Sequence, residues 1–186
     1  MRPAVIAGAA CIALGALGIG WFAWDNVGTN LIASPGQKAA VQRFERAPQL
    51  APLNPQPGET YAVLRIPAIH LVEPIIEGTD EADLQHGVGH YSQTVQPGAP
   101  GNVGLAGHRT TYGRPFWNLQ ALKPGDVITI QTAEATYTYK VISQETVSPS
   151  DIAVLNSRPV RTLTMTTCTP RFTALQRLAV HALQVY

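Results

Sequence analysis

Cysteine is rare in this chain, and one of its two cysteines is placed where a thiol could do chemistry. Cys11 lies in an apolar run near the N-terminus, so it is not expected to pair with Cys168. Cys168 follows the strand-like sequence TLTMTT and precedes Thr169-Pro170, which places it at the end of a strand. A thiol there can act as a nucleophile if a neighbouring cation or imidazole favours the thiolate. The alternative is a buried cysteine that only packs, which is the commoner fate of this residue.

Candidate partners for this thiol are basic residues that also lie near strand ends. His108 follows the strand-like NVGLAG, and Arg177 begins the last strand-like segment. An imidazole exchanges protons near neutral pH, and a guanidinium that stays charged can bind an oxyanion. Arg171 lies closer to Cys168 in the sequence and is a competing candidate. No carboxylate stands out as a third catalytic group.

These candidates require a scaffold of strands to bring them together. Apolar and β-branched segments recur between turn signals and begin at positions 61, 69, 102, 126, 135, 161 and 176. Short helices are expected near residues 80–86 and 115–122, and the sequence KPGD at 123–126 is typical of a turn. So many strands with so few helices predict a mainly β barrel or sandwich.

The N-terminal region has the composition of a membrane anchor. Residues 4–24 form an uncharged run of 21 residues, long enough as a helix to cross a hydrocarbon core of about 30 Å. Three aromatic residues, Trp21, Phe22 and Trp24, lie at its end, where the headgroup layer favours them. The alternative is a cleaved signal peptide, whose apolar core is shorter, about 7 to 15 residues. We predict an uncleaved transmembrane anchor over residues 1–25, and nearby charges do not fix its orientation.

The composition divides the rest of the chain into a linker and one domain. Residues 26–60 are rich in Pro, Gln and Ala, which predicts an extended linker, and residues 61–186 form the predicted globular domain. Charged residues make up 13% of the chain and its net charge is +1, so a nucleic-acid partner is not expected. We also expect no metal and no other cofactor, because cysteine, histidine and acidic residues do not cluster at ligand spacing.

Several segments of the sequence resemble the sortase family. The segment TLTMTTCTPRFTALQRLAV resembles the sortase signature around the cysteine, and LAGHRTTYGRPFWNL resembles the histidine region. The segments LRIPAI, GVGHY, GNVGLAGH and LKPGDVI occur in the family's order across residues 61–186. The sequence CTPRF and the short gap before Arg177 are most similar to class E sortases of high-GC Gram-positive bacteria.

This resemblance implies a fold and an activity. The implied fold is a closed eight-stranded sortase-type β barrel with a few short helices, preceded by one transmembrane helix. The implied activity is that of a cysteine transpeptidase, a peptidase-like hydrolase, that cleaves a C-terminal sorting signal between Thr and Gly through a thioacyl intermediate. The class implies an LAxTG-like signal, and an LPxTG-like signal is the alternative. Catalytic roles fall on Cys168, His108 and Arg177, and Arg177 is preferred to Arg171 because it holds the family's strand-start position.

The resemblance also indicates substrate-binding residues, each with a plainer alternative. Thr167 matches the Thr-Cys pair of the family, but it is equally an ordinary strand threonine. Ile152, Val154 and Leu155 lie in the segment that forms one wall of the family's substrate groove, and the alternative is that they close the core. The GVGHY segment, which contains His90, is expected to be structural.

The implied partners are secreted proteins that carry a sorting signal, a peptidoglycan precursor or lipid II amine as the acceptor, and the membrane itself. The implied location is the cell membrane, with one span and the catalytic domain outside the cell. Two alternatives remain open. One is a pilus-polymerising sortase, whose acceptor is a lysine of another protein, and the other is a membrane-tethered β-barrel binding module that has lost catalysis.

Overall fold

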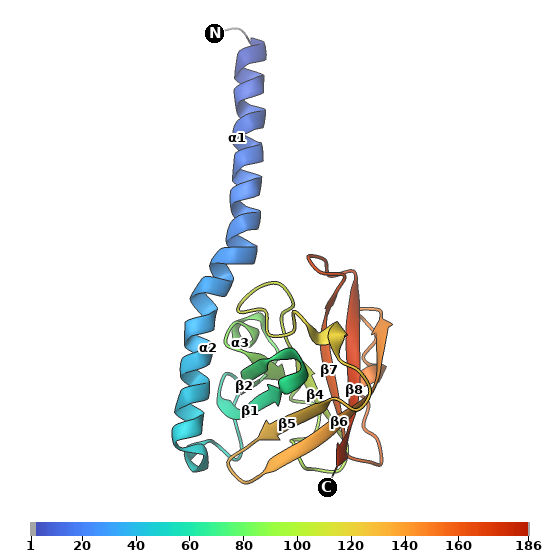
Figure 1. Cartoon of the computed structure of the whole chain (residues 1–186). Helices are drawn as coiled ribbons and strands as arrows, with labels where there is room; N and C mark the ends of the chain where they lie inside the picture. The colour runs from blue at the N-terminus through green and yellow to red at the C-terminus, as the bar shows by residue number, and fades with distance from the viewer. Residues whose placement is uncertain (1–2, 186) are drawn as a thin grey trace.

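A computed structural model describes residues 3–185 as a long helical segment beside a closed β-barrel (Figure 1). The first two residues of the predicted anchor and the last residue of the predicted domain lie outside the described residues. The two termini lie at opposite ends of the molecule in this view, with the C-terminus at the base of the barrel and the N-terminus at the far end of the long helix.

The barrel has eight strands in the order β1-β2-β3-β4-β7-β8-β6-β5, and β5 pairs with β1 to close it. Pairs β2/β3 and β4/β7 are parallel, and the other neighbours are antiparallel. This confirms the predicted closed barrel. Its strands are β1 (Thr60–Ile66), β2 (Leu71–Glu77), β3 (Val88–His90), β4 (Asn102–Ala106), β5 (Val127–Gln131), β6 (Thr136–Val147), β7 (Thr162–Thr169) and β8 (Gln176–Val185).

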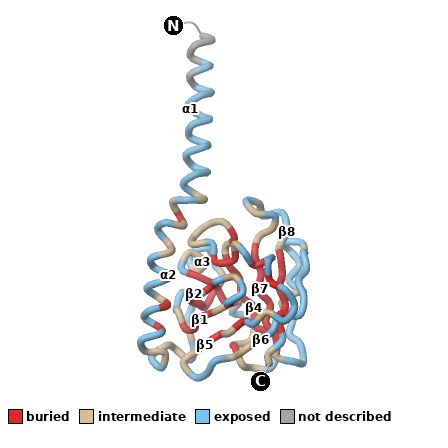
Figure 2. Tube along the Cα trace, viewed as in Figure 1, coloured by how far each residue is buried: buried red, intermediate tan, exposed pale blue. Residues whose placement is uncertain are grey.

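The interior of the barrel is filled by alternate apolar side chains of its strands. Figure 2 shows that the buried residues are concentrated on these strands. In β7, Leu163 and Met165 belong to this core, whereas the alternate threonines face the outer side of the sheet. These threonines are also buried, because Thr164 bonds to His181 of β8 and Thr166 lies 3.0 Å from the hydroxyl of Tyr91. Strand β7 is therefore covered on both faces until it reaches Cys168, which is half-buried.

The short helical elements lie mostly where the sequence predicts them. Helix α3 (Glu81–Leu84) falls within residues 80–86, and the 3₁₀ turn η4 (Leu119–Ala121) falls within residues 115–122. The predicted turn before β5 is closed by the backbone N–H of Lys123, which donates to the Asp126 carboxylate at 2.7 Å. Three further 3₁₀ turns are η2 (Pro48–Leu50), η3 (Pro67–Ile69) and η5 (Ala153–Leu155).

The N-terminal segment consists of helix α1 (Pro3–Ala23), a π-helical turn η1 (Trp24–Gly28) and helix α2 (Thr29–Arg46). By length and composition this segment can cross a membrane, although no membrane is present. Large apolar side chains of α1, such as Leu14 and Ile19, are exposed, which suits contact with lipid rather than water.

The prediction of an extended linker over residues 26–60 is wrong for residues 29–46, which form α2 packed on the barrel. Val41 and Phe44 are buried against Val63 of β1, and this contact stabilises a helix that its own sequence favours weakly. Pro35 and Gly36 lie inside α2, and both residues disfavour a helix interior, so local composition indicated a tether. Residues 47–59 are irregular apart from η2.

Candidate active site

Three adjacent strands bring the predicted catalytic residues to one end of the barrel. Cys168 of β7 lies directly opposite Arg177 of β8 in the antiparallel ladder. On the other side of β7, strand β4 runs parallel and pairs Ala106 with Thr166. His108 follows β4 by two residues, so it reaches the same level as Cys168.

His108 and Cys168 line the same cleft, which has a volume of about 360 Å³. Its rim includes Phe172 and Ala174 from the β7–β8 turn and, unexpectedly, Trp21 from the end of α1. The guanidinium of Arg177 donates to the carbonyl oxygens of Ala174 and Gln176, at 3.4 and 3.3 Å. The arginine therefore lies at the base of the turn that forms the rim, beside the thiol.

The environment of His108 favours the neutral imidazole. Burial lowers the pKa of His108 from its ordinary value of 6.5, while the carboxylates of Glu81 and Asp25 oppose this shift. Its Nε2 atom is buried without a hydrogen-bond partner among residues 3–185. The ring lies against Tyr112, with 5.0 Å between the ring centroids. A neutral imidazole that lines a cleft can act as a general base toward an incoming nucleophile.

Arg109 is a residue of the site that sequence reasoning missed. Its Nη1 donates to the carbonyl oxygen of Cys168 at 3.0 Å, and its Nη2 donates to the side chain of Gln120. Burial lowers the pKa of Arg109, and the nearby Arg171 adds to this effect. Arg109 thus holds the end of β7 in place next to the histidine segment. Its position directly after His108 was the available signal.

Arg171, the competing arginine, binds to Trp117. Its guanidinium stacks over Trp117 at 4.1 Å from the ring centroid and donates to the Trp117 carbonyl oxygen at 3.0 Å. Cation–π stacking of this kind fixes an arginine side chain. Arg177 is therefore the arginine that the ladder places beside Cys168.

Thr167 and the segment around residue 154 have distinct surroundings. Thr167 is buried, and its hydroxyl donates to the Gly107 carbonyl oxygen at 2.7 Å, which ties β7 to the segment before His108. Leu155 lies over Gly104 on the outer face of β4, whereas Ile152 is 74% exposed. The Val154 carbonyl accepts a hydrogen bond from Asn102 at 3.3 Å. This segment therefore covers the outside of β4 and lies outside the core cluster of the described chain.

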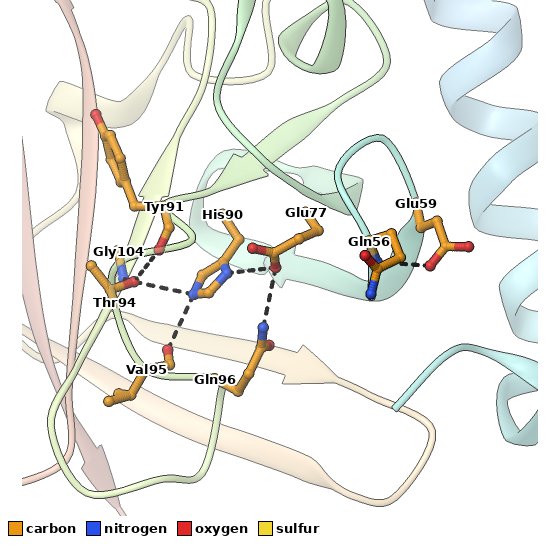
Figure 3. A network of polar contacts seen from close by, with 9 residues as sticks. All are labelled: Gln56, Glu59, Glu77, His90, Tyr91, Thr94, Val95, Gln96 and Gly104. Carbon is orange, nitrogen blue, oxygen red and sulfur yellow. Dashed lines mark hydrogen bonds and ion pairs between the residues drawn. The ribbon is translucent and has the colours of Figure 1, made fainter. Parts of the chain in front are cut away.

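The GVGHY segment forms a buried polar network, shown in Figure 3. The His90 Nδ1 lies 2.8 Å from the Glu77 carboxylate, and its Nε2 lies 3.1 Å from the Val95 carbonyl oxygen. Thr94 joins the network to β4, because its hydroxyl oxygen accepts the Gly104 N–H at 2.9 Å. This confirms the structural interpretation of His90, which fixes the loop between β3 and β4.

A closed barrel that carries a thiol, an imidazole and a guanidinium at the ends of three adjacent strands defines the class of cysteine-dependent barrel enzymes. A comparison with family models finds a sortase domain over residues 64–185. The chain therefore belongs to the sortase family of cysteine transpeptidases, as the sequence resemblance predicts.

The similar sequences support the likeness to class E. Over 141 residues the chain is 42% identical to sortase SrtE1 of Streptomyces coelicolor, covering 67% of this chain and 40% of that protein. It is 32% identical over 127 residues to sortase D of Bacillus subtilis, covering 68% of this chain and 63% of that protein. The chain thus spans less than two thirds of the length of either relative.

Solved structures agree with the assignment to the sortase family. A Clostridium perfringens sortase D5 transpeptidase superposes with a TM-score of 0.73 at 29% identity, over 82% of this chain and 99% of that one. Sortase E1 of Streptomyces coelicolor, solved with a tripeptide in its active site, superposes with a TM-score of 0.66 at 38% identity, over 72% and 92% of the two chains.

Proposed function

We propose that this protein is a membrane-anchored transpeptidase that cleaves a C-terminal sorting signal between Thr and Gly and transfers the protein to a cell-wall amine. The observation that carries this proposal is the pairing of Cys168 with Arg177 on adjacent strands, beside a cleft that Cys168 shares with His108. An LAxTG-like signal is favoured because class E relatives are similar to this chain, with LPxTG as the alternative.

In the first half of the reaction, the Cys168 sulfur attacks the threonine carbonyl carbon of the signal. A C–S bond forms, the C–N bond to glycine breaks, and the His108 imidazolium gives its proton to the departing amine. Arg177 donates to the oxyanion of the tetrahedral intermediate, which requires it to leave the backbone carbonyls that it now contacts.

In the second half, an amine of the peptidoglycan precursor attacks the thioacyl carbon. The C–S bond breaks as the new amide forms, and the neutral His108 imidazole takes the proton of the incoming amine. The lowered pKa of His108 suits this step, because burial favours the neutral imidazole. The enzyme returns to its starting protonation state.

The proposed location follows from the activity. An enzyme that joins proteins to the wall must face outward, so α1 crosses the membrane once and residues from about 25 onward are extracellular. The substrate groove in this proposal runs over the outer face of β4, where Leu155 and Val154 form one wall and Ile152 is free to contact peptide. Thr167 contributes by holding the thiol strand against the histidine segment.

The test is mass spectrometry of the full chain in detergent micelles, incubated with LAxTG and LPxTG peptides and a glycine amine. We expect cleavage at Thr-Gly, a thioacyl adduct on Cys168 and an amide product, all lost in Cys168→Ala. A pilin lysine peptide in place of the glycine amine separates wall anchoring from pilus assembly. If a folded wild-type chain forms neither adduct nor product, the binding-module alternative replaces this proposal.

A further inference from the structure

The loop that follows His108 has an unusual backbone. Tyr112, Gly113 and Arg114 are consecutive residues with positive φ angles of 50°, 80° and 47°. Only glycine adopts this region readily, so Tyr112 and Arg114 need support from their surroundings. Within the loop, the Arg114 N–H donates to the Thr111 carbonyl oxygen at 2.8 Å, and this hydrogen bond partly stabilises the unusual backbone conformation.

Helix α2 supplies further support through Gln37, a buried polar side chain. Its Nε2 donates to the Tyr112 carbonyl oxygen at 2.8 Å and to the Gln85 carbonyl oxygen at 3.3 Å. A Cβ atom on Gly113 would overlap the Gln37 amide, so only glycine fits at this position of the loop. A buried glutamine with both donors on loop carbonyls fixes the loop relative to the helix.

Two more residues near the start of α2 contact the same loop. Asn30 donates to the Thr110 carbonyl oxygen at 2.9 Å. The hydroxyl oxygen of Thr29, which is buried, accepts the Tyr112 N–H at 3.3 Å. Together with Gln37, these side chains bind three backbone groups within residues 110–112, which lie immediately after the His108-Arg109 pair.

Tyr112 connects the loop that α2 holds to the imidazole of His108. The Tyr112 ring packs on His108 with 5.0 Å between the centroids, and the Phe116 N–H donates to the His108 carbonyl oxygen at 3.1 Å. The Nε2 of His108 has no bond of its own within residues 3–185, so packing sets the direction of the ring. Helix α2, which holds this loop, ends at Arg46 and lies outside the matched sortase domain of residues 64–185.

We propose that α2 is a positioning element of the active site, in which Gln37, Asn30 and Thr29 hold the 110–112 backbone so that Tyr112 aims His108 at Cys168. The role described for His108 rests on the proposed transpeptidase function. Undocking of α2 from the barrel releases the loop and disables the enzyme while leaving the barrel folded. The helix that follows the membrane anchor thereby becomes part of the catalytic machinery.

The test uses the full chain in detergent micelles and compares Gln37→Met with Gln42→Met. The first substitution keeps the side-chain length and removes both donors, and the second makes the same change at an exposed position of α2. We expect Gln37→Met to lower kcat for peptide cleavage by about 10- to 100-fold with little change in KM, as for a misplaced catalytic group. Asn30→Leu should lower kcat in the same sense, and Gln42→Met should match the wild type.

A second readout does not depend on turnover. Histidine-labelled NMR titration reports the His108 pKa, which should rise toward 6.5 in Gln37→Met because the released ring becomes solvated. The carboxylates of Glu81 and Asp25 act on the ring, Arg109 and Cys168 line the same cleft, and none of these residues is changed. If wild-type kcat and His108 pKa persist in folded Gln37→Met, the positioning role is overturned. If the wild type cleaves no peptide but the His108 pKa shifts as expected, the proposed function fails and the positioning role survives.

Discussion

At the scale of single residues, the two arginines that follow Cys168 are separated by their contacts. Arg177 lies opposite the thiol and Arg171 stacks on Trp117. We expect Arg177→Lys to lower kcat/KM by about 10²- to 10³-fold, because lysine loses the planar fork that binds the oxyanion. Arg171→Lys, the matched control, should change thermal stability more than kcat/KM. Equal losses of kcat/KM in the two folded variants would contradict the assignment.

The pH profile offers a second test at this scale. Burial lowers the pKa of His108, so the imidazole stays neutral to a lower pH than a solvated histidine does. Above that pKa the imidazole is neutral and has no proton to give to the departing glycine amine, so the first half of the proposed reaction slows. We therefore expect the alkaline limb of kcat/KM that belongs to His108 to have its midpoint below 6.5. A midpoint above 6.5 would mean that Glu81 and Asp25 outweigh burial.

Residue types, spacing and the sortase resemblance selected three candidate catalytic residues, but the neighbours of these residues could not be predicted in the same way. Cys168, His108 and Arg177 stand at strand ends in segments with a family pattern. Asp25 lies 83 positions before His108 in the sequence, and only the docking of the N-terminal segment brings it near the ring. A contact between segments so far apart leaves no local signature, because the residue types involved are common on any surface.

At the scale of elements, apolar and β-branched segments predicted seven of the eight strands but neither β3 nor the pairing of the strands. Strand β3 has three residues and exists because parallel pairing with β2 and antiparallel pairing with β4 complete its hydrogen bonds. Helix α2 was not predicted from the sequence. Tertiary contacts of Val41 and Phe44 outweigh the weak helix propensity around Pro35. Propensity decides little where packing supplies the larger free energy.

The interface between α2 and the barrel contains a carboxyl group that should make stability depend on pH. Burial raises the pKa of Glu73 on β2 from 4.5 to about 7, and Lys38 of α2 partly opposes the shift. Between these values the folded chain keeps a proton that the unfolded chain releases, so the free energy of unfolding falls as pH rises from 4.5 to about 7. Above about pH 7 Glu73 is ionised in both the folded and the unfolded chain, so the free energy of unfolding no longer changes because of this group.

Glu73→Gln removes this cost and should stabilise the protein at pH 8 but not at pH 4.5. The expected gain at pH 8 is about 1 to 3 kcal/mol in the free energy of unfolding, measured by urea denaturation. Glu134→Gln, at an exposed position in the turn between β5 and β6, is the control and should show no such pH dependence. A gain for Glu73→Gln that is equal at both pH values would show that the carboxyl is solvated in the folded state.

At the scale of the whole molecule, the proposed membrane anchor and the candidate active site lie at the same end of the barrel. The β7–β8 turn lies at the end of the barrel nearest the junction of α1 and α2 (Figure 1). Phe22 of α1 contacts Phe172 of this turn, with 6.1 Å between ring centroids. In the proposed topology the cleft therefore opens close to the membrane surface, where a lipid-linked acceptor would present its amine.

Two truncations separate anchoring from positioning. Removing residues 1–20 deletes most of α1 but keeps the cleft residues Trp21, Phe22 and Asp25 and all of α2. We expect this variant to leave the membrane fraction on ultracentrifugation and to cleave a soluble peptide with nearly wild-type kcat, because Gln37 still holds the histidine loop. Transfer to an acceptor embedded in vesicles should fall, since the enzyme no longer shares the surface with it.

Removing residues 1–46 deletes α2 as well and should lower kcat for the soluble peptide by about the same 10- to 100-fold as Gln37→Met. Circular dichroism must show the barrel folded, because Val63 and Glu73 lose the helix that covers them. If this shorter chain is folded and fully active, α2 serves only as a spacer. If the chain lacking residues 1–20 stays with the membrane, α1 is not the sole anchor, and the apolar rim around Phe172 becomes the next segment to test.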